Sequence, residues 1–227
     1  MIRHWLTAAL VLVMLVGLTA SAQAQPNLRN LKFPPSLQNV FLLRSDEVQQ
    51  ELNLNDEQKT ELQDLTLQLQ QEAFEILSGL QDLTPEEQQE MMGEISEMIA
   101  EKGQEVKAKV DALLNKEQLA RLDELSLQAR GAQALEDESV LSALQVSDEQ
   151  KEKLAEIRDK GMEAIEKALG NLQGGGGQRE LRAKMRELRD ELNEKAMAVL
   201  TPEQKKQLEK MQGEKFEFPS RGGGFPF

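Results

Sequence analysis

The sequence predicts an all-α protein built from two tandem repeats of extended antiparallel helical hairpins with coiled-coil-like packing. Apolar residues recur at helical spacing from Leu42 almost to the end, and no segment alternates as a strand would. One short motif also recurs: an apolar residue, a small polar residue and, three positions later, Gln. Its four copies are Leu54/Asn55/Gln58, Leu114/Asn115/Gln118, Val146/Ser147/Gln150 and Leu200/Thr201/Gln204.

Each copy of the motif predicts the start of a helix. The small polar residue suits the N-cap, where its side chain accepts a hydrogen bond from the backbone N–H at N3. The Gln at N3 can reach back to the N–H of the capping residue. Pro202 fits N1 of the last copy, where the helix needs no donor. By itself the motif marks where helices begin and implies no chemistry.

The first 24 residues are typical of an export signal. Arg3 and His4 precede an apolar stretch over 5–18, and Ala22-Gln23-Ala24 resembles a cleavage site with small residues. We expect cleavage after Ala24 and a periplasmic or secreted protein, without membrane insertion after cleavage. An uncleaved anchor is the alternative. The chain has no Cys, which excludes a lipid-modified Cys at the cleavage site.

The composition of the mature chain argues against an enzyme. His4 and Trp5 are the only His and Trp and both lie in the signal, while Tyr and Cys are absent from all 227 residues. The usual nucleophiles, the usual general base and the usual zinc or copper ligands are therefore missing, and we predict no catalytic residue, no cofactor and no metal site. Without Arg3, 26 basic residues oppose 40 acidic ones, which excludes nucleic acid as a partner.

The predicted chain order begins with a linker over 25–41, which contains Pro26, Pro34 and Pro35. Helical repeat 1 spans 42–134 and helical repeat 2 spans 135–213. Each repeat contains a short helix, two long ones and a final one. We expect these helices at about 45–53, 56–81, 85–113 and 116–131, and at about 138–145, 148–172, 178–199 and 202–213.

A comparison of the two repeats indicates a duplication. At an offset of 92 the stripe from Leu62 to Leu80 falls on Leu154 to Leu172, and at an offset of 86 the stripe from Ile95 to Leu114 falls on Leu181 to Leu200. The spacing of 4-3-4 over 11 residues predicts nearly straight or slightly right-handed packing. Residues 214–227, with four Phe, are predicted to be a disordered tail; a docking peptide is the alternative.

The export signal, the Cys-free helical chain and the motif together resemble the Spy/CpxP-type periplasmic proteins, which carry L-T-x-x-Q at helix starts. Only Leu200, Thr201 and Gln204 match this pattern in full. The resemblance implies an extracytoplasmic chaperone or envelope-stress protein with a curved cradle, often a dimer. Two features depart from the family: the chain is strongly acidic where the family cradle is basic, and the mature chain lacks the His and Cys of zinc-responsive members.

A row of Glu residues and a row of Arg residues lie at helical spacing along the second long helix of repeat 1 and of repeat 2, respectively. The hypothesis is that they flank a packed seam and meet across a contact between repeats or subunits; two separate solvated faces are the alternative. Repeat 1 carries 21 acidic and 8 basic residues, whereas repeat 2 carries 17 and 14. The rows are Glu87, Glu90, Glu94, Glu97 and Glu101, and Arg179, Arg182, Arg186 and Arg189.

Seven methionines at helical spacing could form an adaptable surface for clients, or could simply fill the core. No loop has the ligand spacing of a specific calcium site. The methionines are Met91, Met92, Met98, Met162, Met185, Met197 and Met211.

From these observations we expect a non-enzymatic binding protein that holds unfolded or envelope proteins, with a second copy of the chain as a further candidate partner. The alternative is a structural or adaptor protein whose hairpins bind one another or an envelope partner.

Overall fold

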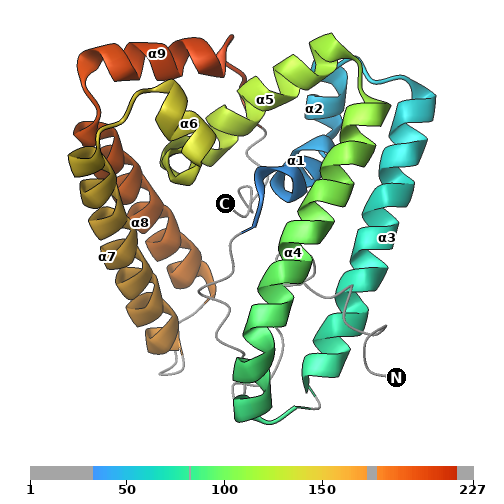
Figure 1. The fold of residues 1–227 in the computed structure, drawn as a ribbon, viewed down its shortest axis with the longest axis horizontal. Helices are drawn as coiled ribbons and strands as arrows, with labels where there is room; N and C mark the ends of the chain where they lie inside the picture. The colour runs from blue at the N-terminus through green and yellow to red at the C-terminus, as the bar shows by residue number, and fades with distance from the viewer. Residues whose placement is uncertain (1–32, 82, 173–177, 219–227) are drawn as a thin grey trace. The chain divides into compact units, whose positions relative to one another are not determined.

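The computed structural model describes residues 33–81, 83–172 and 178–218, and over these ranges the chain is all-α, with no strand. The prediction of an all-α fold is confirmed. The predicted signal over 1–24 lies outside the described residues. Figure 1 shows the helices in chain order: α1 (Pro35–Leu43), α2 (Asp46–Glu51), α3 (Asp56–Gln81), α4 (Pro85–Leu113), α5 (Lys116–Arg130), the 3₁₀ helix η2 (Gly131–Glu136), α6 (Glu138–Ala143), α7 (Asp148–Leu172), α8 (Gln178–Val199) and α9 (Pro202–Gln212).

The long helices begin and end where the caps and the apolar stripes predict. Thr84 caps α4 and Pro85 follows at N1, while Thr201 caps α9 and Pro202 follows at N1. α3 lies beside α4, and α7 lies beside α8 (Figure 1). At 1.5 Å rise per residue, the 29 residues of α4 form a helix about 43 Å long.

The prediction of a linker over 25–41 is wrong for the described part of that range. Residues Pro35–Leu43 form α1, and Leu37, Val40, Leu42 and Leu43 are at most 3% exposed. The prolines misled the prediction, because Pro34 and Pro35 occupy the N-cap and N1, where a helix tolerates proline. The chain thus enters the first helix at the prolines and buries its apolar face at once.

The chain divides into two compact units, and the boundary differs from the predicted one between 134 and 135. Among the described residues, unit 1 contains those up to Ser126 together with Glu217 and Phe218, and unit 2 runs from Leu127 to Phe216. Because helix α5 continues through this point, no break in the helical pattern marks it. Leu127, Ala134 and Leu135 belong to the core of unit 2, which moves the boundary upstream.

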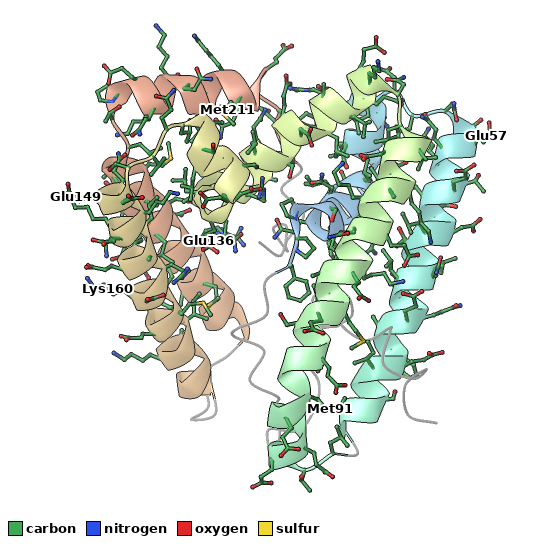
Figure 2. All side chains as sticks on the ribbon, in the orientation of Figure 1. Glu57, Met91, Glu136, Glu149, Lys160 and Met211 are labelled. Carbon is green, nitrogen blue, oxygen red and sulfur yellow. The ribbon has the colours of Figure 1, made fainter. Side chains whose placement is uncertain are left out.

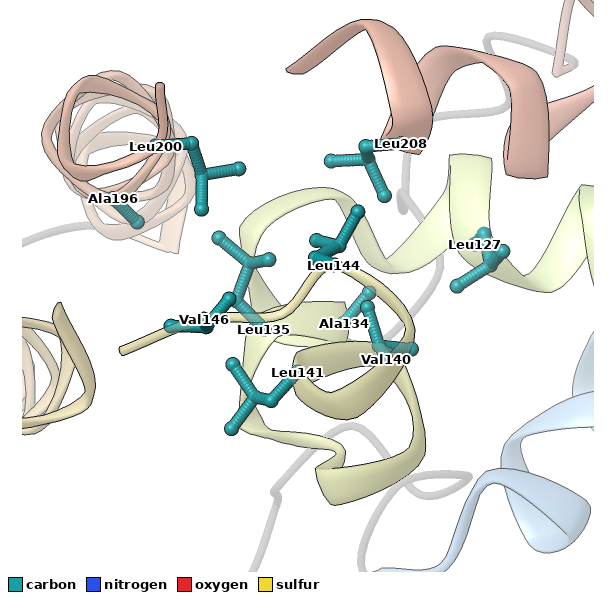
Figure 3. Packing of buried hydrophobic residues seen from close by; sticks show 10 residues of the cluster. All are labelled: Leu127, Ala134, Leu135, Val140, Leu141, Leu144, Val146, Ala196, Leu200 and Leu208. Carbon is teal, nitrogen blue, oxygen red and sulfur yellow. The ribbon is translucent and has the colours of Figure 1, made fainter. Parts of the chain in front are cut away.

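Unit 2 has a core at the end where its short and long helices meet. Figure 3 shows this cluster, and Leu154, Ile157, Met197 and Met211 pack against it. The buried members are Leu127, Ala134, Leu135, Val140, Leu141, Leu144, Val146, Ala196, Leu200 and Leu208.

The core of unit 1 is longer and extends along the helix pair. Buried residues continue down α3 through Leu62, Leu69 and Ile76, and down α4 through Ile95 and Val106. The predicted stripes of repeat 1 are therefore the buried faces of α3 and α4.

Matched turns end the two short helices. Asn53 and Gln145 both have left-handed backbones, with φ of 50° and 52°. In each case the following residue donates its N–H back across the turn, from Leu54 to the Gln49 carbonyl and from Val146 to the Leu141 carbonyl. These are Schellman motifs, which satisfy the last carbonyls of a helix. They place the apolar residue of each motif, Leu54 and Val146, in the core.

Candidate functional site: paired helix starts and incompletely buried apolar surfaces

All four predicted helix starts contain the reciprocal bonds of a capping box. The backbone N–H of Gln58 donates to Asn55 Oδ1 at 2.8 Å, and the Asn55 N–H donates to Gln58 Oε1 at 3.1 Å. Equivalent bonds link Asn115 with Gln118, Ser147 with Gln150, and Thr201 with Gln204.

In unit 1 the two motif glutamines also bind each other. Gln58 Nε2 donates to Gln118 Oε1 at 2.9 Å, and Gln118 Nε2 donates back to Gln58 Oε1 at 3.1 Å. Each amide also donates to a helix-end carbonyl: Gln58 to Leu113 O at 2.9 Å, and Gln118 to Leu52 O at 3.1 Å. Gln118 is only 8% exposed, and every N–H and oxygen of the pair has a partner.

In unit 2 the corresponding residues make the corresponding bonds. Gln150 Nε2 donates to Gln204 Oε1 at 2.8 Å and to Val199 O at 2.8 Å. Gln204 Nε2 donates to Gln150 Oε1 at 3.0 Å and to Leu144 O at 3.2 Å. The amide pair therefore joins the start of one long helix, the start of the final helix and the end of the short helix in both units.

The pairing explains why the N3 residue of these motifs is Gln. A Glu at N3 could accept the bond from the capping N–H, but it has no N–H to donate to a carbonyl or to its partner. The chain itself contains a capping box with Glu at N3: Thr84 and Glu87 form one, and it has no paired motif. Glu87 is exposed there, and the backbone hydrogen bond from Thr84 lowers its pKa. The amide pairs are structural and offer no catalytic chemistry.

A second polar cluster lies along α3 and α4. Lys102 Nζ contacts Glu72 at 2.8 Å and Glu105 at 2.7 Å, and Lys109 contacts Glu105 at 2.9 Å. Partial burial opposes the charged form of Lys102, but the bonds to Glu105 and Glu72 raise its pKa overall. The bonds from Lys102 and Lys109 lower the pKa of Glu105. This cluster links the two helices of unit 1.

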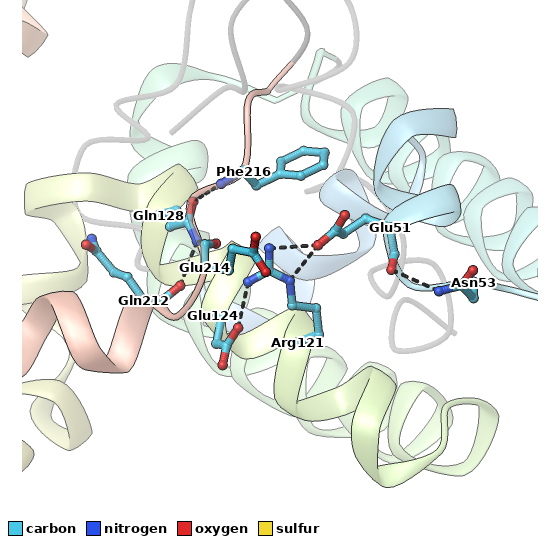
Figure 4. A network of polar contacts seen from close by, with 8 residues as sticks. All are labelled: Glu51, Asn53, Arg121, Glu124, Gln128, Gln212, Glu214 and Phe216. Atoms are coloured by element: carbon cyan, nitrogen blue, oxygen red, sulfur yellow. Dashed lines mark hydrogen bonds and ion pairs between the residues drawn. The ribbon is translucent and has the colours of Figure 1, made fainter.

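Two further residues, Arg121 in unit 1 and Gln128 in unit 2, hold parts of each unit together (Figure 4). In unit 1, Arg121 binds Glu51 of α2 at 2.7 Å and Glu124 of its own helix at 2.6 Å. In unit 2, Gln128 Nε2 donates to the carbonyls of Gln212 and Glu214, and Gln128 Oε1 accepts the Phe216 N–H at 2.9 Å. The predicted disordered tail is thus wrong for 214–216, which Gln128 holds against α5. Residues 219–227 lie outside the described part of the chain.

The two charged rows lie on solvent-facing surfaces where they are described. Glu87, Glu90, Glu94, Glu97 and Glu101 are all exposed on α4. Arg186 and Arg189 are exposed on α8, whereas the side chains of Arg179 and Arg182 lie outside the described residues. Figure 2 shows other charged side chains, such as Glu57, Glu149 and Lys160, pointing outward from α3 and α7. That the rows meet at an interface stays a prediction.

Apolar side chains also remain on the outer surfaces. Leu67 and Phe74 of α3 are 55% and 63% exposed, and Met162 of α7 is 38% exposed. Met197 and Met211 pack against the unit 2 core, which agrees with the interpretation of methionine as core filler at these two positions. Met91, Met98 and Met185 are half-buried, and the side chain of Met92 lies outside the described residues.

Within the described ranges, no group of three or more acidic or histidine side chains is placed to hold a metal ion. In the same part of the chain, no helix is long and apolar enough to cross a membrane. No family model, curated protein or solved structure matches this chain.

Proposed function

We propose that this chain is an extracytoplasmic, non-enzymatic binding protein that holds unfolded clients, as its resemblance to the Spy/CpxP-type proteins implies. The observation that carries the proposal is the incomplete burial of apolar side chains on the long helices, above all Leu67, Phe74 and Met162. Large apolar side chains left in water on α3 and α7 are a means of contacting unfolded chains. No residue acts as a catalyst in this proposal.

The architecture supports holding rather than transforming a client. The amide pairs of Gln58 with Gln118 and of Gln150 with Gln204 lock the helix ends of each unit. The long helices therefore present their side chains from a rigid frame, and binding costs little ordering of the protein itself. The strongly acidic surface keeps such a protein soluble while it exposes apolar groups.

The experiment uses the mature chain 25–227 and an unrelated enzyme that aggregates on heating or on dilution from denaturant. We expect the mature chain to reduce light scattering by the client in the absence of ATP. A matched acidic protein without exposed apolar side chains is the control. If the mature chain at molar excess leaves the scattering unchanged, the proposed function is wrong.

A second candidate function is an adaptor that binds helices of its own kind. Leu67 and Phe74 lie seven residues apart on α3 and are both exposed, which is the spacing by which one helix packs along another. Light scattering of the purified chain over a range of concentrations tests this alternative. The adaptor is favoured if the purified chain forms a stable oligomer and the Leu67→Glu, Phe74→Glu double variant dissociates to monomers. The wild-type chain should then have no effect on client aggregation.

A further inference from the structure

Helix α1 covers an apolar face in unit 1. It packs against α4 and α3, and Ser36 Oγ donates to the Gly103 carbonyl at 2.7 Å. A side chain at Gly103 would collide with the ring of Pro34, so α1 starts directly on the backbone of α4. Ile99 and Val106 share this face of α4 and are 2% and 1% exposed.

Over the part of the chain that the structure describes, the corresponding face of unit 2 is less completely buried. At the predicted offset of 86, Met185 and Leu192 stand where unit 1 has Ile99 and Val106, and both are half-buried instead of buried. On α7, Ile165 is half-buried and Met162 is exposed. We call these four residues, Met162, Ile165, Met185 and Leu192, the α7–α8 stripe.

The short helix η2 covers only one end of α8. It packs against α8, and its Ala132 N–H donates to Asn193 Oδ1 at 2.8 Å. Asn193 is eight residues beyond Met185, or about 12 Å along the helix. The six residues of η2 therefore leave the Met185 end of the stripe without the cover that the nine residues of α1 provide in unit 1.

We propose that the α7–α8 stripe binds one kind of client segment: an uncharged, leucine- and valine-rich stretch resembling α1, which packs as a short helix. This inference rests on the proposed function and names the client segment and its site. The sequence of α1, Pro35–Leu43, carries no charge and buries Leu37, Val40 and Leu43 on its own hairpin. Helix α1 thus shows which kind of segment packs against the apolar face of a helix pair in this chain.

One difference between the units makes the bound client segment exchangeable. Arg189, which is exposed, stands at the position that corresponds to Gly103. A client segment therefore cannot approach the backbone of α8 as α1 approaches α4, and it buries less apolar surface. Binding is weaker than the permanent docking of α1, which suits a protein that must release its clients.

The test uses a fluorescent peptide of residues 34–43 and the mature chain 25–227. Fluorescence anisotropy measures the peptide affinity of the wild type, of Met162→Glu with Met185→Glu, and of the control Ala108→Glu with Ala112→Glu, two exposed positions of α4. Both variants replace two incompletely buried apolar residues with two carboxylates. We expect the stripe variant to bind at least about tenfold more weakly and the control to stay within about twofold, because a carboxylate in an apolar contact is costly.

A cross-linking measurement keeps the test decisive if the stripe variant misfolds. A photoreactive phenylalanine at the peptide position of Phe41 should label α7 and α8 of the wild-type chain. No binding to the wild type, labels confined to α3 and α4, or loss of binding in the control variant alone would overturn the inference.

The two proposals fail separately. If the wild type suppresses client aggregation but the peptide labels another surface, the proposed function stands and this inference falls. If the peptide binds the stripe but aggregation is unaffected, the function as a holder of unfolded proteins falls and the binding surface stands.

Discussion

Glutamine at N3 of the four motifs is the residue on which the ends of both units depend. Its oxygen accepts the capping N–H and a bond from the partner glutamine, and its nitrogen donates to a helix-end carbonyl and to that partner. Four helix ends thus share two amides without leaving a polar atom unpaired. Loss of the Gln118 amide nitrogen removes a donor from two acceptors, the Leu52 carbonyl and Gln58 Oε1, which costs more than the loss of one surface hydrogen bond.

Gln118→Glu should therefore destabilise the protein by about 1–3 kcal/mol, since the Leu52 carbonyl and Gln58 Oε1 each lose a donor. Urea denaturation followed by circular dichroism measures the change. The control is Gln104→Glu, which adds the same charge at an exposed position of α4. An equal shift of the denaturation midpoint in both variants would show that the amide pair does not matter.

Asp137, the N-cap of α6, links stability to pH. Burial raises its pKa, but hydrogen bonds from Ser139 and the charge of Arg130 lower it overall to below the ordinary 3.8. Because the folded pKa is lowered, the carboxylate stabilises the fold above about pH 4, and this contribution is lost as the pH falls through the folded pKa.

Asp137→Asn retains a capping side chain but removes the charge. We expect the variant to melt at a lower temperature than the wild type at pH 7 and the difference to shrink below about pH 4. Thermal melts over a pH series test this, with Glu209→Gln on the exposed face of α9 as the control. A difference that stays constant from pH 7 to pH 3 would contradict the assignment.

At the level of the element, α1 is the helix that the sequence did not predict, because its prolines indicated a linker. Pro34 and Pro35 stand at the N-terminus of the helix, where they break nothing, and the nine-residue helix Pro35–Leu43 buries four apolar side chains. The same position explains the glycine in α4: Gly103 is buried because the ring of Pro34 and the hydroxyl of Ser36 occupy the space of its side chain.

Gly103→Leu should displace α1 from α4 and expose the face that includes Ile99 and Val106. We expect a loss of about 2–4 kcal/mol, equivalent to exposing one or two aliphatic side chains, together with increased binding of a hydrophobic dye. Gly93→Leu is the matched control, since no atom lies within 4 Å of a Cβ at that position. The control should be neutral or slightly stabilising, because Leu is the better helix former.

For the molecule as a whole, the division into two units predicts that a substitution in one unit destabilises that unit and leaves the stability of the other unchanged. All bonds of the Gln58–Gln118 pair lie within unit 1, and all bonds of the Gln150–Gln204 pair lie within unit 2. Sites that share no partner usually contribute independently to stability.

Gln204→Glu should therefore increase hydrogen exchange in α8 and α9 while the amides of α3 and α4 keep their protection. Hydrogen–deuterium exchange with mass spectrometry resolves the two units, and Gln207→Glu on the exposed surface of α9 serves as the control. Equal deprotection of α3 and α4 would show that the two units open as one.

The sequence by itself determined the all-helical class and the bounds of the long helices. Those depend on local signals: caps such as Thr84 and Thr201, and apolar stripes with a helical period. It also placed Gln58, Gln118, Gln150 and Gln204 at N3, where their bonds to the caps are local. Helix α1 was not predicted, because a pair of prolines is compatible both with a linker and with a helix start.

Only the tertiary structure decided which glutamines pair, where the units divide and which described apolar face is incompletely buried. Gln58 and Gln118 are 60 residues apart, so no local pattern shows that their amides meet. The cover of α4 by α1 and the incomplete burial of Met185 and Leu192 depend on which element packs against each stripe. Periodicity shows that a helix has an apolar face, but burial of that face is decided by contacts between segments far apart in the chain.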